Sequence, residues 1–303
     1  MKTKNKRRTI CRGLFVMLFS ICSSIAFGQT QLRYQYEAGS SAQQQFVQQS
    51  DVSVAVADQK ITSSLSHTIR WRVNVSDVSD ESSAAISRTI EGVKIAISAP
   101  GLQSVEYDTD SAESEEASQL LDSIKAMVGL EVKYDSDAIG RITNLAVDKS
   151  ALDKISSSIV NGAAVVNESS LTKMVKGATI VLPTKPVKQG DSWKQVFAFD
   201  TTALPASMAL EFTYKGNTER DGKQLEVLDI KPRLTIQNDG KTARGKVSIR
   251  KQQGQGTLLF DNYKGSIHEL SFETVVETEA VIGQNTVAQT VSTKVTLSNS
   301  RPE

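Results

Sequence analysis

Residues 60–75, KITSSLSHTIRWRVNV, decide the fold of this chain. Every second residue, counted from Ile61, belongs to a set that is rich in apolar side chains and includes Trp71. The residues between them, Arg70 and Arg72 among them, are all polar or charged. Such an alternation predicts a β-strand with one apolar face and one face in water. The strand is long, so we expect a large antiparallel sheet.

Neighbouring segments repeat the pattern. Residues 46–56 carry apolar side chains at several even positions, and Asp58-Gln59 reads as the tip of a hairpin that joins this segment to the first strand. The strand after residue 84 changes phase at Glu91-Gly92, which predicts a β-bulge. The second half of the chain contains further strands, expected near residues 193–199, 210–214, 225–227, 234–236, 247–249, 270–282 and 287–297.

Two helices are predicted in the middle of the chain. Residues 114–128 place apolar side chains at helical spacing behind an acidic first turn, and Gly129 is expected to end that helix. A second helix is expected to begin near Ser150 and to bury Leu152, Ile155 and Ile159. A short hairpin, residues 131–145, lies between them. Residues 161–176 are small and polar, and their pattern favours no single state.

The fold class that follows is mostly β. We expect long antiparallel strands in a curved sheet or open barrel that covers two or three α-helices, because the apolar face of such a sheet must pack against other apolar side chains. The alternative is two stacked β subdomains joined near residues 161–190. We expect residues 29–303 to form a single β-rich domain. A weak internal repeat pairs the segment 134–145 with 260–270. Two similar halves, at about 29–160 and 177–303, would explain this repeat, and so would the chance recurrence of a common hairpin pattern.

The first 28 residues predict export. Six basic residues and no acidic one precede an apolar stretch from Gly13 to Cys22, which is shorter than the roughly 20 residues of a membrane-spanning helix. Ala26-Phe27-Gly28 then offers small residues where a signal peptidase cuts. We interpret residues 1–28 as a secretory signal peptide cleaved before Gln29, which places the protein in the periplasm or outside the cell. No later apolar run is long enough to span a membrane.

The charge and the cysteine content of the mature chain exclude some classes of protein. Without the six basic residues of the signal, 29 Lys and Arg remain of 35, against 34 Asp and Glu. This weak negative charge argues against a nucleic-acid partner. Both cysteines, Cys11 and Cys22, lie in the signal, so the mature chain has no disulfide and no thiolate.

Three blocks carry a resemblance to a known family. They are residues 127–145, the segment LPTKPVKQGDSW at 182–193, and residues 256–270. In this order they resemble a family of secreted bacterial proteins catalogued as domain of unknown function 6263. The resemblance implies an exported β-rich protein and supplies no catalytic residues. By shape, the expected long strands around apolar helices are also similar to the open barrels of lipoprotein-carrier proteins.

No group of residues predicts a catalytic, cofactor or metal site. His67 falls on the apolar face of its strand and His268 follows a turn at the surface. The acidic residues 108–116 are interpreted as a solvated loop rather than a calcium site, and Asp135 and Asp137 as turn residues. The aromatic side chains fall on apolar strand faces, where they belong to the core. The polar second face, with residues such as Glu273 and Glu277, argues against an outer-membrane barrel.

Three classes of function remain. We expect a non-catalytic protein of the cell envelope that binds or carries an apolar ligand, because a large amphipathic sheet leaves apolar cavities. The alternative is a structural or protein-interaction module of the envelope, with an envelope protein as its partner. An enzyme ranks third, because it would need a pair of carboxylates brought together only in space. No cofactor is expected.

Overall fold

The computed structural model describes residues 28–56, 59–79, 83–101, 104–111, 124–149, 159–160, 163–164, 168–200, 205–237, 241–242, 245–282 and 285–300. The predicted signal peptide, residues 1–28, therefore lies outside the described residues except for Gly28. In the described part of the chain no helix is long and apolar enough to cross a membrane.

Thirteen of the described strands form one antiparallel sheet, with the order β6-β5-β3-β2-β1-β15-β14-β13-β11-β10-β9, in which β4 pairs with β3 and β12 with β13. In chain order, the first six strands of this sheet are β1 Ser41–Val56, β2 Gln59–Val78, β3 Ala84–Ser98, β4 Val105–Asp108, β5 Glu131–Ser136 and β6 Ile142–Val147. The next two strands, β7 Ile159–Val160 and β8 Ala163–Ala164, form a separate pair. The others are β9 Ser192–Asp200, β10 Pro205–Arg220, β11 Lys223–Ile236, β12 Lys241–Thr242, β13 Gly245–Asp261, β14 Ser266–Ile282 and β15 Asn285–Ser300. The sheet is not closed, because β6 and β9 stand at its two edges.

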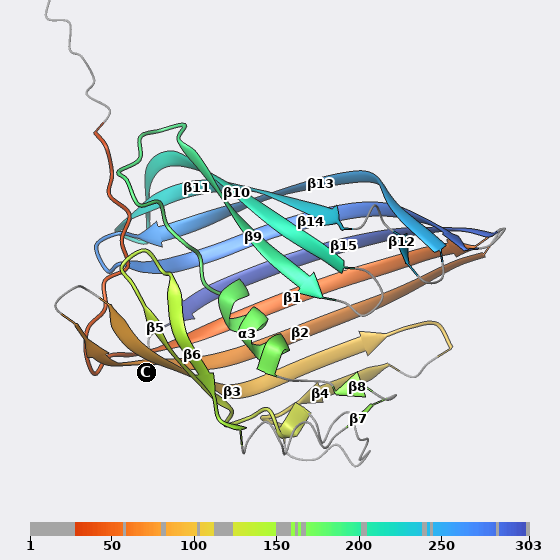
Figure 1. Ribbon diagram of the computed structural model, residues 1–303, viewed down its shortest axis with the longest axis horizontal. Helices are drawn as coiled ribbons and strands as arrows, with labels where there is room; N and C mark the ends of the chain where they lie inside the picture. The colour runs from red at the N-terminus through yellow and green to blue at the C-terminus, as the bar shows by residue number, and fades with distance from the viewer. Residues whose placement is uncertain are drawn as a thin grey trace, which may run out of the picture.

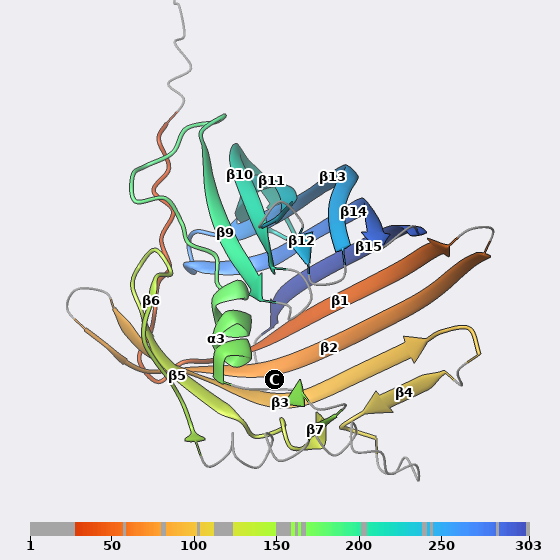
Figure 2. The same cartoon turned by 45° about the vertical axis from the view of Figure 1, so that its right-hand side comes forward.

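The curvature of the sheet brings its two wings to face each other. Figures 1 and 2 show β1, β2 and β3 in one wing and β9, β10 and β11 in the other, with α3 (Glu168–Gly177) between them near one end. This helix contacts both edge strands, β6 and β9. The expected curved sheet is therefore confirmed in place of two stacked subdomains, and of the two or three helices expected beneath it the described residues contain α3 in full. The two similar halves remain a prediction.

The register places one apolar set of side chains on the inner face. Trp71 lies opposite Gln44 of β1, and Ile69 lies opposite Phe46. Trp71 is almost fully buried, whereas Arg70 and Arg72 form ion pairs with Asp110 and Glu91 on the other face. The alternation of residues 60–75 thus predicted the faces of β2 correctly.

The predicted bulge in β3 is present. Arg70 of β2 pairs with Gly92, and the next residue, Trp71, pairs with Ile90, so Glu91 is the extra residue. A bulge shifts the alternation by one residue. Because of that shift both Ile90 and Val93 are buried on the inner face, on either side of Glu91.

The helix predictions are corrected in part. Only the end of the predicted helix 114–128 falls within the described residues: Ile124 and Lys125 are helical, and Gly129 follows with a positive φ of 85°, as expected of a helix end. Val128, the last apolar residue of the predicted helix, is 40% exposed, because the chain has already left the helix there.

Most of the second predicted helix also lies outside the described residues. Its residues 150–158, with Leu152 and Ile155, lie outside the described residues. Ile159, which we expected in that helix, instead belongs to the two-residue strand β7. The unassigned stretch 161–176 contains most of α3, whose Leu171 and Val175 are fully buried against the inner face of the sheet.

Candidate functional site

Within the described residues, the inner face of the sheet is covered at one end only. Near α3, Ile69 and Trp71 are 7% and 2% exposed, because they share a core with Leu171 and with Ile124. We call this the capped end. It also contains the hairpin β5–β6 and the N-terminal segment 31–37, which packs Leu32 into the core of the opposite wing.

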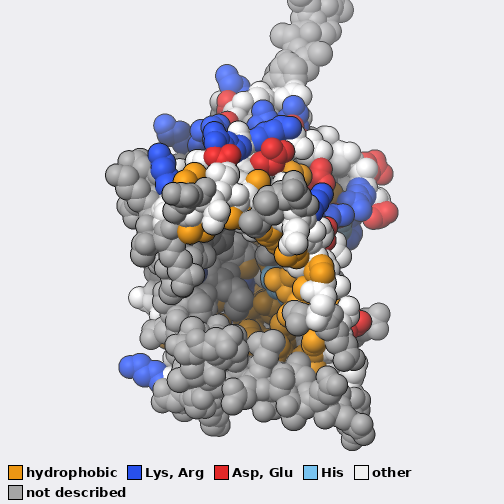
Figure 3. Space-filling view, turned by 90° about the vertical axis from the view of Figure 1, so that its right-hand side faces the viewer, with side chains coloured by type: hydrophobic (Ala, Val, Ile, Leu, Met, Phe, Trp, Pro, Cys, Tyr) orange, Lys and Arg blue, Asp and Glu red, His pale blue; other side chains and the backbone are white. Residues whose placement is uncertain are grey.

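At the other end the same face carries exposed apolar side chains. Ile61 and Leu65 of β2 are 52% and 38% exposed, although both lie in line with Trp71. Val105 of β4 and Ile282 of β14, which the register also places on the inner face, are 42% and 46% exposed. Figure 3 looks into this end and shows a hollow with hydrophobic side chains along its wall. We call the hollow, with these four residues at its end, the trough.

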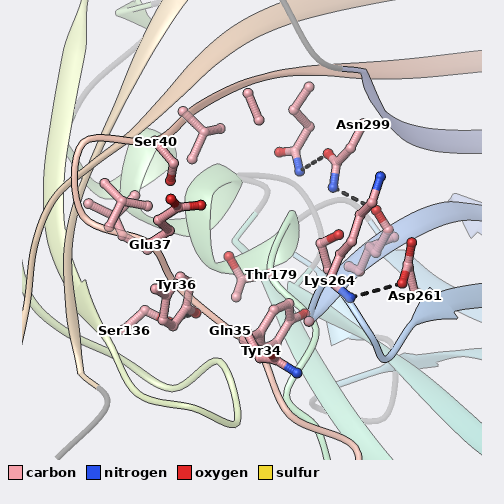
Figure 4. A pocket seen from close by; sticks show the side chains of 18 of the residues that line it. Tyr34, Gln35, Tyr36, Glu37, Ser40, Ser136, Thr179, Asp261, Lys264 and Asn299 are labelled. Carbon is pink, nitrogen blue, oxygen red and sulfur yellow. Dashed lines mark hydrogen bonds between the residues drawn. The ribbon is translucent and has the colours of Figure 1, made fainter. Parts of the chain in front are cut away.

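A cavity of about 740 Å³ lies at the capped end. Its walls come from the segment 34–41, the adjacent ends of β2, β3 and β5, and the loop that joins β13 to β14. Figure 4 shows Tyr34, Tyr36 and Ser136 on one side of this space and Asn299 and Lys264 on another. The volume lies within the range of ligand pockets, about 300–1,000 Å³.

Two amides are fixed in the wall of this cavity. The Nε2 group of Gln44 donates to Oδ1 of Asn299 at 2.9 Å, and Nδ2 of Asn299 donates to the carbonyl of Ile267 at 2.7 Å. The Oε1 atom of Gln44 is buried and accepts no hydrogen bond. An unpaired buried acceptor costs about 1–3 kcal/mol, so its presence in the wall requires an explanation.

Arg88 lies in the same wall and is also without full partners. It occupies a buried position of β3 between Ile86 and Ile90, and it is only 6% exposed. Its Nε and Nη1 groups have no hydrogen-bond partner. Among the described residues no carboxylate forms an ion pair with Arg88, and its guanidinium lies over the ring of Tyr134.

Three tyrosines surround Arg88 or the space beside it. Burial raises the pKa of Tyr36 to about 12, and it also raises the pKa of Tyr34 and of Tyr134. All three hydroxyl groups therefore stay neutral near neutral pH. The Tyr34 hydroxyl donates to the carbonyl of Ile180 at 2.9 Å, and the Tyr36 hydroxyl lies 2.8 Å from Oγ of Ser136. Their rings add apolar surface to the cavity.

The structure separates the residues that we considered for chemistry. His67 lies on the inner face, with its ring 5.6 Å from that of Phe46, and burial lowers its pKa. His268 lines the cavity, whereas we expected it at the surface. Within the described residues no group of His, Cys, Asp and Glu could hold a metal ion.

The acidic residues have structural roles where they are described. Asp108 accepts the N–H of Asp110, and residues 112–116 lie outside the described residues. Asp137 accepts the N–H groups of Ile139 and Arg141 and so builds its turn. Asp135, in contrast, accepts a hydrogen bond from Asn144 across the hairpin.

Sequence reasoning missed Arg88 and Gln44. A signal was present, because each occupies a strand position whose neighbours at two-residue spacing, such as Ile86, Ile90 and Phe46, face the core. A polar residue within an apolar set is the pattern expected of a buried polar group.

A family model described as a family of unknown function (DUF6263) matches residues 81–267. The chain belongs to the DUF6263 family. The matched region begins just before β3 and ends within β14, so it includes Arg88 and Tyr134. It leaves out β1 and β2, which form the wall with Gln44, Ile61 and Leu65. No curated protein matches this DUF6263 chain.

Solved structures similar to this DUF6263 protein are distant. A structure titled for lipid–protein interactions in lipovitellin has a TM-score of 0.42 and 10% identity over 89% of this chain, which spans only 26% of that chain. An outer membrane channel from Pseudomonas putida F1 has a TM-score of 0.25 and 7% identity, with 88% and 97% of the two chains covered. A DUF1329 family protein from Desulfovibrio piger has a TM-score of 0.16 and 9% identity, with 82% and 83% covered. At these values the likenesses say nothing about a ligand.

Proposed function

We propose that this DUF6263 protein is a non-catalytic, exported protein of the cell envelope that binds an apolar ligand in the trough. The observation that carries the proposal is the exposure of inward-facing apolar side chains at the uncovered end. Ile61 and Leu65 are 52% and 38% exposed on the face where Trp71 is buried. Grouped apolar side chains in a concave surface are typical of ligand sites.

The polar residues of the inner face suit a ligand rather than a packed core. Among the apolar side chains of β1 stand Gln48 and Ser50, and Ser50 lies within hydrogen-bond distance of Thr293 on β15, at 3.1 Å. These groups satisfy one another, so an apolar molecule can contact them without leaving them unpaired. A mixed lining of this kind offers apolar contact with a few polar groups to orient the ligand.

Export is supported by residues 1–28 of the sequence, with their basic start, short apolar stretch and small residues at 26 and 28. N-terminal sequencing of the protein from its producing cell tests this part. We expect a new N-terminus at or near Gln29. Intact Met1 in a membrane fraction would contradict it.

Ligand binding is tested with N-phenyl-1-naphthylamine, a neutral apolar fluorophore, titrated into the purified mature protein. We expect saturable binding that Ile61→Glu weakens by at least about tenfold, because the new carboxylate would have to be desolvated. Thr62→Glu is the matched control, since Thr62 is also exposed but lies on the opposite face of β2. Its affinity for the fluorophore should match that of the wild type.

Two outcomes decide between the candidate functions. Native mass spectrometry of the exported protein should show co-purified lipid if the trough is a carrier site. If the fluorophore does not bind the wild type, or if both variants bind it equally, the ligand-binding proposal is wrong. A structural or protein-interaction module of the envelope would then replace it.

A further inference from the structure

We propose that the cavity at the capped end binds an oxyanion, a carboxylate or a phosphate, that is attached to an apolar body, with Arg88 as its counter-charge. This site is additional to the trough and does not depend on ligand binding there. The juxtaposition that carries it is a buried guanidinium that has no carboxylate partner in the part of the chain that the structure describes and that lies in the wall of a cavity of ligand size.

Arg88 cannot avoid the free-energy cost of a buried charge by losing a proton. A guanidinium stays protonated at any pH that a protein meets, so it cannot become neutral as a buried lysine can. A buried charge without a partner is strongly unfavourable, and buried charges in proteins are paired as a rule. Burial of Arg88 at 6% exposure with two unpaired N–H groups therefore points to an anion that arrives with a ligand.

The other charged side chains around the cavity do not cancel Arg88. Glu37 and Asp261 line it, and so do Lys223 and Lys264. The Oδ1 atom of Asp261 already accepts the backbone N–H of Lys264 at 2.9 Å, an interaction that Figure 4 shows. By count, the two carboxylates offset the two lysines, and no ion pair joins either carboxylate to Arg88 among the described residues, so the positive charge of Arg88 is left over.

The rest of the lining fits an apolar body. Val73, Val75 and Ile86 lie in the wall beside Arg88, and the rings of Tyr34, Tyr36 and Tyr134 complete this part. A free inorganic anion would leave this surface uncovered in a space of about 740 Å³. A ligand with both an anionic group and a hydrocarbon or aromatic part would contact both kinds of wall.

The test uses four probes and isothermal titration calorimetry on the mature protein: octanoate, octyl phosphate, 1-octanol and inorganic phosphate. We expect at least one of the two anionic amphiphiles to bind about tenfold or more tighter than 1-octanol, as a charge-assisted hydrogen bond implies. The preferred amphiphile identifies the oxyanion as carboxylate or phosphate. Inorganic phosphate should bind more weakly than octyl phosphate, because it lacks the apolar part.

The matched variants are Arg88→Met and Arg72→Met, since Arg72 lies on the outer face of the neighbouring strand and pairs with Glu91. Arg88→Met should reduce the affinity for the preferred amphiphile to that of 1-octanol, while the melting temperature of the free protein stays equal or rises. A residue with a structural role would lower that temperature instead. Arg72→Met should keep the affinity for the amphiphile.

Three results would overturn the proposal: equal affinities for 1-octanol and both amphiphiles, unchanged binding in Arg88→Met, or inorganic phosphate binding as tightly as octyl phosphate. If Arg88→Met does not fold, Arg88→Lys replaces it and should keep the preference for the anion, because it keeps the charge. Binding of N-phenyl-1-naphthylamine in the trough should survive in every Arg88 variant. Failure of this site therefore leaves the trough proposal untouched.

Discussion

The guanidinium carbon of Arg88 lies 5.6 Å from the centre of the Tyr134 ring. The face of an aromatic ring attracts a cation, and the attraction grows where water is excluded. Burial raises the pKa of Tyr134, and the positive charge of Arg88 lowers it in part. The ring is therefore a partial substitute for the missing counter-ion of Arg88.

This pair predicts a measurable coupling. Tyr134→Leu should destabilise the ligand-free protein by more in the wild type than in Arg88→Met, because only in the wild type does it remove interactions with the guanidinium, namely the cation–ring contact and the hydrogen bond of the hydroxyl. The coupling from a double-mutant cycle in urea should be about 0.5–2 kcal/mol. A coupling of zero would mean that the ring only fills space beside the guanidinium.

A substitution at Trp71 tests how much the core at the capped end contributes to the free energy of unfolding. The Trp71 side chain is 2% exposed and packs in one core with Ile69, Ile90 and Leu171. Trp71→Ala should lower the free energy of unfolding by about 3–5 kcal/mol, because it leaves a cavity that the rigid sheet cannot fill. Arg72→Ala, on the exposed face, should change it by less than about 1 kcal/mol. Urea unfolding curves of both variants check the prediction, and equal effects would show that the face of β2 is assigned wrongly.

His67 predicts a pH dependence of stability. Burial holds its pKa below the ordinary value of 6.5, so the unfolded chain binds a proton at a higher pH than the folded chain does. The free energy of unfolding should therefore fall as the pH drops from 6.5 through the pKa of the folded state. Urea unfolding at pH 8 and pH 5 should show a smaller loss in His67→Gln than in the wild type.

Gly265 predicts a steric requirement in the turn between β13 and β14. Its φ is 60°, and a Cβ atom there would overlap the backbone nitrogen of Gln35. Gly222 has a similar φ of 70° but nothing near the place of a Cβ atom. Both alanine variants share the backbone strain of the left-handed region, of order 1 kcal/mol.

Gly265→Ala should therefore lower the free energy of unfolding by clearly more than Gly222→Ala does. It should also speed proteolytic cleavage within residues 29–37, since the hydrogen bond from the N–H of Gln35 to the carbonyl of Gly265 would be displaced. Similar stabilities and similar cleavage in the two variants would show that the N-terminal segment shifts to make room.

A substitution at Ile124 tests whether the segment that contains it is needed to cover the inner face of the sheet. Ile124 is 2% exposed within the core that contains Trp71, whereas Val128 is 40% exposed. Ile124→Asp should unfold the protein or cost several kcal/mol, because a buried carboxylate there would have no partner. Val128→Asp should be tolerated in thermal melts. A stable Ile124→Asp protein would mean that this segment leaves the sheet without loss.

Local patterns predicted the strands well because each strand carries its own face in its alternation. Residues 60–75 predicted the strand that buries Trp71, and the change of phase at Glu91 predicted the bulge. Gly140 and Gly265 occupy matching turn positions of the repeated segments 134–145 and 260–270, and both take positive φ, 84° and 60°. The helix α3 gave no such signal, since few of its ten residues are apolar. Its position depends on contacts with two strands distant in the chain.

The sequence by itself determined the strand faces, the turns and the expectation of export, because each of these depends on residues that are neighbours in the chain. The weak negative charge expected of the mature chain follows from its composition alone. Only the tertiary structure decided which part of the apolar face is covered: Ile61 and Trp71 share a face of β2, yet the first is 52% and the second 2% exposed. The same holds for Arg88: alternation places it among residues that face the core, but it does not show whether a counter-ion lies beside it. Its burial without a counter-ion results from strands and segments that fold over it, so the candidate site exists only when distant parts of the chain meet.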